Sequence, residues 1–191
     1  MSSKIKDMEH KLKSGNILKI IQDNNPLNPR TEWDNLGTMV CFHNRYSLGD
    51  KNHGFDSANY DSWSVLEKDI QKNHDAVIIL PLYLYDHSGI TISTKPFSCR
   101  WDSGQIGFIF VSKKVLRNVY GKKRISKKLI GEVTKYLENE VDTYDDYLTG
   151  NVWGFEVTND KDEIINSCWG FFGEDINKNG ILEHINDELV N

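Results

Sequence analysis

The stretch SKKLIGEVTKYLENEVDTYDDYLTGNVWGFEV, residues 126–157, decides the fold class because it sets a long helix directly before a strand. Apolar side chains recur at three- and four-residue spacing from Leu129 to Leu148, which predicts a helix with one buried stripe. Ser126 suits the N-cap, and Gly150 ends the pattern. Beyond it, residues 152–157 and 164–172 flank a turn-forming TNDKD and predict a hairpin.

The rest of the chain has the same mixture of short strands and helices. Strands without a clean β-α-β alternation predict an α+β protein with a mainly antiparallel sheet and three to five helices. We expect a single compact domain over residues 16–191, preceded by a polar arm or short helix over residues 1–15. The further strands are expected at 17–21, 37–42, 76–85, 90–94 and 106–111, and the further helices at 63–72, 113–120 and about 180–190.

Composition limits the class of protein. Of 191 residues, 38% are hydrophobic and 27% charged, which is typical of a globular chain. No apolar run reaches the roughly 18 residues that a bilayer span requires, and the first 16 residues lack the apolar core of a signal peptide. We therefore expect a cytoplasmic protein without membrane contact.

Charge is distributed unevenly along the chain. Residues 1–130 carry 20 Lys and Arg against 13 Asp and Glu, a net +7, whereas residues 131–191 carry 3 against 15, a net −12. Such asymmetry suggests charged partners. The alternative is that the two parts neutralise each other.

The basic run is the clearest local signal. No acidic residue occurs between Asp102 and Glu132. A helix and a turn would gather its cations into a patch that can hold phosphates, or into a solvated surface that faces the acidic part. The residues that would bind nucleic acid are Lys113, Lys114, Arg117, Lys122, Lys123 and Arg124.

The acidic segment supplies the other candidate surface. Carboxylates at the end of the long helix and in the hairpin turn would lie outward and meet a partner's basic groups. Alternatively, Asp142 and Asp146 share a helix face and, with Asp145 and Glu156, could hold a divalent ion or form a plain solvated face. The residues we expect to bind a partner are Asp142, Asp145, Asp146, Asp160, Asp162 and Glu163.

Motifs for catalysis and for cofactors are weak. Asp86-His87-Ser88 invites comparison with a hydrolase, but sequence adjacency does not make a triad and no GxSxG occurs. Residues 175–186 resemble an EF-hand loop that ends in Asn186 instead of Glu, so we favour a turn and helix start over a weak calcium site. Without paired Cys or His at ligand spacing, or a phosphate-binding loop, we predict no tightly bound zinc, no cofactor and no catalytic residues.

A long loop, residues 43–61, is rich in Gly, Asn, Asp and Ser. Loops of this length in compact domains are often functional or mobile. If charge does not carry recognition, the suspects are the aromatic residues Trp33, Tyr46, Trp63 and Trp101.

Five segments carry a resemblance to known proteins: EWDNLGTMVCFHNRYSLGD (32–50), ILPLYLYDHSGITIS (79–93), PFSCRWDSGQIGFIFVSKK (96–114), VDTYDDYLTGNVWGFEV (141–157) and SCWGFFG (167–173). They resemble an uncharacterised family of proteins from bacteriophages, prophages and plasmids of Firmicutes and related bacteria. The resemblance covers most of residues 17–175 and implies a mobile genetic element as the setting, with no fold, reaction or site.

That setting favours an accessory protein that inhibits a host nucleic-acid-targeting defence system, of the anti-CRISPR or anti-restriction type. It would bind the defence nuclease or nucleoprotein complex, because an acidic surface can occupy a channel built for DNA phosphates. Two alternatives remain open: a metal-dependent nucleic-acid-processing enzyme, and a nucleic-acid-binding accessory protein that uses the basic run at 113–128. We favour a binding protein over an enzyme.

Overall fold

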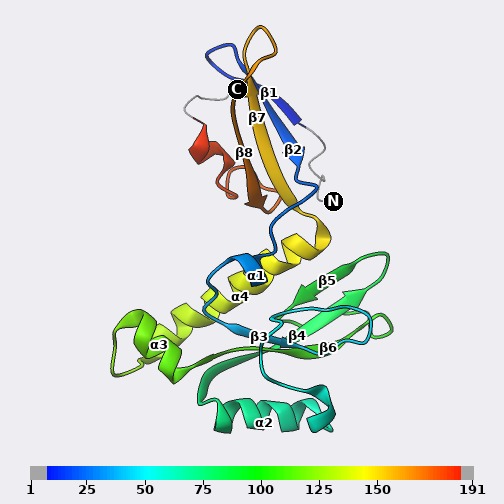
Figure 1. Cartoon of the computed structure of the whole chain (residues 1–191), viewed down its shortest axis with the longest axis vertical. Helices are drawn as coiled ribbons and strands as arrows, with labels where there is room; N and C mark the ends of the chain where they lie inside the picture. The colour runs from blue at the N-terminus through cyan, green and yellow to red at the C-terminus, as the bar shows by residue number, and fades with distance from the viewer. Residues whose placement is uncertain (1–7, 186–191) are drawn as a thin grey trace. The chain divides into compact units, whose positions relative to one another are not determined.

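The computed structural model describes residues 8–185 and has an α+β fold with two antiparallel four-stranded sheets (Figure 1), which confirms the predicted class. The chain divides into two compact units. The central unit comprises Pro29–Asp145, and the split unit comprises Met1–Asn28 together with Asp146–Asn191. Each unit contains one of the sheets.

The sheet of the central unit has the strand order β3-β6-β4-β5, and each neighbouring pair is antiparallel. Pro81 lies inside β4, opposite Phe108 of β6, whereas β5 pairs only with residues 83–86 of β4. The missing N–H of Pro81 is tolerated because no described strand continues along that side of β4. The bounds are β3 Thr38–Cys41, β4 Ala76–Asp86, β5 Ile90–Ser93 and β6 Ser103–Ser112.

Helices cover both faces of this sheet, and β6 shows why. Phe108 and Phe110 pack with Leu66 and Ile70 of α2. On the opposite face, Ile109 and Leu137 of α4 both lie against Gly37, so α2 and α4 sandwich the sheet, as Figure 1 shows. The helices are α1 Pro29–Glu32, α2 Trp63–Asn73, α3 Lys113–Tyr120 and α4 Lys127–Thr149, with a short 3₁₀ turn η1 at Ser57–Asn59.

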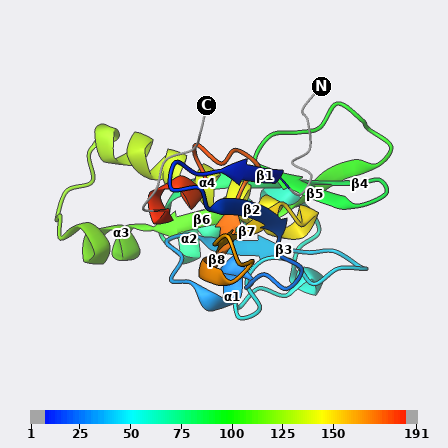
Figure 2. The same ribbon diagram turned by 90° about the horizontal axis from the view of Figure 1, so that it is seen from above.

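The long helix follows the predicted pattern. The buried residues of α4 are Leu129, Val133, Leu137, Val141 and Tyr144. Ser126 Oγ accepts from Leu129 N at its start, and Ser112 Oγ likewise accepts from Val115 N at the start of α3. Figure 2 shows the α3–α4 connection extending away from β6.

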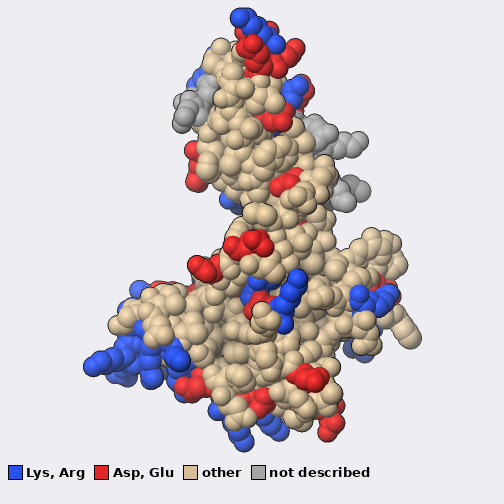
Figure 3. All heavy atoms as spheres, viewed as in Figure 1, with Lys and Arg blue, Asp and Glu red and all other residues tan. Residues whose placement is uncertain are grey.

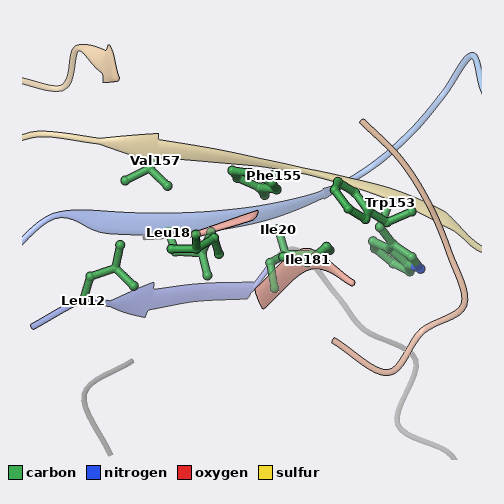
Figure 4. Close-up of a cluster of buried hydrophobic side chains, with 9 residues drawn as sticks. Leu12, Leu18, Ile20, Trp153, Phe155, Val157 and Ile181 are labelled. Carbon is green, nitrogen blue, oxygen red and sulfur yellow. The ribbon is translucent and has the colours of Figure 1, made fainter. Parts of the chain in front are cut away.

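The split unit has the strand order β1-β2-β7-β8, again antiparallel throughout. Its core side chains come from β2, β7 and β8 and from a short 3₁₀ helix, η2 (Figure 4). Leu18, Ile20 and Phe155 are fully buried there. The bounds are β1 Met8–Lys11, β2 Ile17–Gln22, β7 Val152–Thr158, β8 Ile164–Phe172 and η2 Ile181–His184.

Two expectations differ from the structure at the ends of the described residues. Residues 8–11 form β1 instead of a polar arm, because their backbone pairs with Ile17–Ile20, whereas residues 1–7 of the expected arm lie outside the described part. The expected helix at 180–190 is only the single turn η2, since Ile185 is already extended. Positions 186–190 of that expectation lie outside the described residues.

Candidate functional site

One cavity of the central unit is large enough to consider as a site. It has a volume of about 930 Å³ and is lined entirely by residues between Cys41 and Trp63, that is, by the end of β3, the long loop and the start of α2. We call it the loop pocket. Its size is within the range of small-molecule sites.

A buried ion cluster holds Asp50, one of the residues that line the loop pocket. The Arg30 side chain is 1% exposed and makes a bidentate contact with Asp50, with Nε 2.8 Å from Oδ1 and Nη2 2.9 Å from Oδ2. Its Nη1 donates to Glu140 Oε2 at 2.9 Å, and Nη2 also donates to the Gly37 carbonyl. Because a buried charge is tolerated only when it is paired, this cluster holds the loop at Asp50.

The backbone next to Asp50 is equally constrained. Gly49 has φ +71°, and a Cβ there would lie 2.7 Å from the Met39 carbonyl oxygen. Its N–H donates to Tyr144 Oη at 3.1 Å, and Asp50 N donates to Met39 O at 2.9 Å. The loop is therefore tied to β3 and α4, and only glycine fits this position without strain.

Two imidazoles of the loop pocket present the same nitrogen to the backbone. His43 Nδ1 accepts from Arg45 N and Tyr46 N at 3.3 Å, and His53 Nδ1 accepts from Phe55 N at 3.0 Å. A nitrogen that accepts carries no proton, so in the neutral rings the proton is on Nε2. Burial lowers the pKa of His53, which keeps this ring neutral.

Aromatic rings form one wall of the loop pocket. Phe42 stacks with both Tyr60 and Trp63, at ring-centroid distances of 6.4 and 6.2 Å and interplanar angles of 21° and 17°. A second stack places Arg45 over Tyr46, which in turn stacks on His43 at 5.0 Å. Of the aromatic suspects, Tyr46 and Trp63 line this pocket, whereas Trp33 lines a smaller one and Trp101 is 95% exposed.

The basic run forms an exposed surface at α3, the turn after it and the start of α4. Figure 3 shows Lys and Arg side chains gathered over this part. Lys113 is 2.7 Å from Asp75 and so is paired. Six exposed cations of the run form no salt bridge with another described residue. We call these six the basic surface: Lys114, Arg117, Lys122, Lys123, Arg124 and Lys127.

The acidic candidates are distributed over both units. Asp142 and Asp145 belong to the central unit, and the others to the split unit. Asp145 is half-buried and accepts from Thr91 Oγ1 at 2.6 Å and Ile92 N at 2.7 Å, so it supports β5. Asp146 accepts from Asn151. Partial desolvation and the like charges of Asp145 and Glu138 raise the pKa of Asp142.

In the hairpin turn of the split unit the acidic side chains are exposed. Asp160, Asp162 and Glu163 all face solvent between β7 and β8. Asn159 Nδ2 donates to Glu163 Oε2 at 2.8 Å, which holds one of the three. This turn agrees with the expectation of outward-facing carboxylates, whereas Asp145 and Asp146 use their oxygens within the fold.

The candidate triad Asp86-His87-Ser88 does not assemble. Asp86 contacts Arg45, and Ser88 lies in the turn before β5. His87 Nδ1 instead lies 3.3 Å from Asp102, which Cys99 Sγ also approaches at 3.7 Å. The half-buried Asp102 carboxylate thus contacts both the imidazole and the thiol, and no hydrogen bond among the described residues joins the Ser88 hydroxyl to Asp86 or His87, as nucleophilic catalysis by this triad requires.

Metal ligands do not converge among residues 8–185, where no group of three His, Cys, Asp or Glu side chains could hold an ion. The EF-hand-like segment is a turn in which Asp175 accepts from Asn177 N and contacts Lys178 at 3.0 Å. Asp175 thus uses its oxygens within its own turn. The twelfth position of that motif, Asn186, lies outside the described residues.

None of the described helices is long and apolar enough to cross a membrane.

Comparison with known proteins identifies no relative: no family model, no curated protein and no solved structure matches the chain.

Proposed function

We propose that the protein binds nucleic acid through the basic surface, either as free DNA or RNA or as the nucleic-acid part of a host nucleoprotein complex. The observation that supports this most directly is the group of six exposed cations at α3 and the start of α4, without an acidic side chain between Asp102 and Glu132. Lys and Arg gathered in this way bind the phosphate backbone independently of sequence.

The distribution of charge within the central unit supports the proposal. Residues 29–145 contain 16 Lys and Arg and 15 Asp and Glu, a net +1. A nearly neutral unit that places six of its 16 Lys and Arg side chains on one surface, at α3, the following turn and the start of α4, is suited to an anionic partner. Tyr120, which is 37% exposed at the end of α3, adds a ring on which a base can stack.

The test measures binding of a fluorescent 20-nucleotide DNA, single- and double-stranded, by anisotropy at several salt concentrations. The triple variant Lys122→Glu/Lys123→Glu/Arg124→Glu should weaken binding at least about tenfold and reduce the steepness of the salt dependence. The matched control Lys68→Glu/Lys72→Glu/Lys161→Glu makes the same change in net charge outside the basic surface and should retain most of the affinity. Equal losses in both variants would contradict the proposal.

A second candidate is the inhibition of a host nucleic-acid-targeting defence complex through the acidic turn. The exposure of Asp160, Asp162 and Glu163 favours it, and the mobile-element setting of the resembling family is compatible with it. Changing these three residues to Lys should abolish inhibition of the complex and leave DNA binding intact. Inhibition that persists in this variant and disappears in the 122–124 variant would assign the contact to the basic surface instead.

A further inference from the structure

The loop pocket has the features of a small-molecule site that neither charged surface explains. We infer that it binds one nucleotide, with the base against its aromatic wall and the phosphate beside Arg45 and Lys51. This goes beyond the proposed function and does not rest on it, because no residue of the basic surface lines the pocket.

The pocket is built before any ligand arrives. The Arg30 guanidinium, Gly49 and the Tyr144 hydroxyl hold the loop at its midpoint, and Trp63 packs edge-on against Phe108 of β6 at 6.3 Å. A preformed site spares the ligand the cost of ordering a loop. About 930 Å³ leaves room for a base, a ribose and a phosphate.

The aromatic wall suits a planar base. Phe42 is stacked with Tyr60 and with Trp63, at interplanar angles of 21° and 17°, and all three rings line the pocket. The Arg45–Tyr46–His43 stack supplies further planar faces from the loop. Bases stack on aromatic rings and on guanidinium planes with little sequence preference.

Two imidazoles supply hydrogen-bond donors to the pocket. In both His43 and His53 the Nδ1 atom accepts from a backbone N–H. The Nε2–H group of each ring has no acceptor among the described residues. These two N–H groups can donate to a base carbonyl or to a phosphate oxygen. The pocket therefore favours a ligand rich in acceptors.

The charges agree with an anionic group. Asp50 lines the pocket, but its oxygens accept from Arg30 Nε, Arg30 Nη2 and Met39 N at 2.8–2.9 Å, so its charge is compensated. Lys51 is exposed and forms no salt bridge with a described residue. The Arg45 side chain is 68% exposed; it pairs with the Asp86 carboxylate and lies over the Tyr46 ring, and a phosphate can compete for its guanidinium from the solvent side. Asp61 is the other carboxylate of the lining and is exposed to solvent.

The test titrates the whole chain with UMP, AMP and uridine by calorimetry. Trp63→Leu should weaken all three at least about fivefold, since a base loses its stacking surface, whereas Trp101→Leu, which changes a tryptophan outside the pocket, should not. Lys51→Gln should weaken UMP and AMP but not uridine, and Lys68→Gln should change none of them. The Lys51 comparison remains decisive if Trp63→Leu is unstable.

Two results would overturn the inference: no saturable binding of UMP or AMP at millimolar concentration, or equal losses in the pocket variants and their controls. The 122–124 triple variant separates this site from the basic surface, because it should lose DNA but keep UMP. A competition experiment on this variant then separates two sources of the nucleotide. If a ten-residue oligothymidylate displaces UMP, the ligand is a nucleotide within a nucleic-acid strand; if UMP binds and is not displaced, the ligand is a free nucleotide.

Discussion

The contact between Gly37 and Leu137 gives a prediction in which two destabilising changes partly compensate each other. Leu137 is fully buried on α4. A Cβ on Gly37 would lie 2.7 Å from Leu137 Cδ2 and 2.8 Å from Ile109 Cδ1 and Cγ1, closer than real Cβ contacts. The space that Leu137 fills is therefore the space that an alanine at position 37 would need.

The magnitudes follow from packing. Leu137→Ala removes a fully buried side chain and should cost about 2–5 kcal/mol of unfolding free energy. Gly37→Ala overpacks the same place and should cost about 1–3 kcal/mol. In the double variant the new methyl group enters the cavity, so the double variant should lose about 1 kcal/mol less stability than the sum of the two single variants. The compensation is only partial because the Ile109 side chain stays in place.

Urea denaturation of the four proteins measures this coupling. Gly131→Ala is the control, because a Cβ at this exposed helical position meets no atom within 4 Å. It should stabilise the protein by about 0.5–1 kcal/mol and add to Leu137→Ala without coupling. Additivity of Gly37→Ala and Leu137→Ala within about 0.3 kcal/mol would refute the packing of α4 on this face.

Four further predictions concern titratable groups. Burial lowers the pKa of His53, so the folded protein binds fewer protons than the unfolded chain below about pH 6.5. The free energy of unfolding should therefore fall as the pH drops from about 6.5 through the lowered pKa. The variant His53→Gln should remove this pH dependence. Asp145→Ala leaves Thr91 and Ile92 N without their acceptor and should cost about 1–3 kcal/mol. Asp142→Asn instead relieves like charges and should raise the denaturation midpoint slightly. Burial raises the pKa of Cys41 to about 12, so a thiol reagent at pH 8 should modify Cys99 and Cys168 first and Cys41 only on unfolding; Cys41→Ser should leave the fast phase unchanged.

Local patterns predicted most of the elements. The stripe from Leu129 to Tyr144 and the cap at Ser126 predicted α4 because helix periodicity and capping act within a few residues. The basic surface could be predicted for the same reason, since its cations are close in the sequence. By contrast, β1 has the sequence MEHK, whose polar side chains are normal for an edge strand but give no strand pattern.

The loop pocket could not be predicted as a site, because the contacts that build it join distant residues. Arg30 meets Asp50 and Glu140, which are 20 and 110 positions away. The role of Asp145 was missed likewise, since its partner Thr91 lies 54 positions earlier. The available signal was the length of the 43–61 loop and its His and Tyr content, which marks a loop as functional without saying what it holds.

The start of α4 offers a separate test of the proposal that the basic surface binds nucleic acid. A helix N-terminus is stabilised by acidic side chains, yet Lys127 opens α4, and neither α3 nor α4 has an acidic residue in its first turn. A sequence that breaks this local rule usually does so for function. Lys127 forms no salt bridge with a described residue, so Lys127→Glu should stabilise the fold by about 0.3–1 kcal/mol while weakening DNA binding and reducing the logarithmic salt slope by about 1. A less stable variant in denaturation would show that the cation at this position serves the helix. Unchanged DNA binding in the anisotropy assay would show that it does not contact a phosphate.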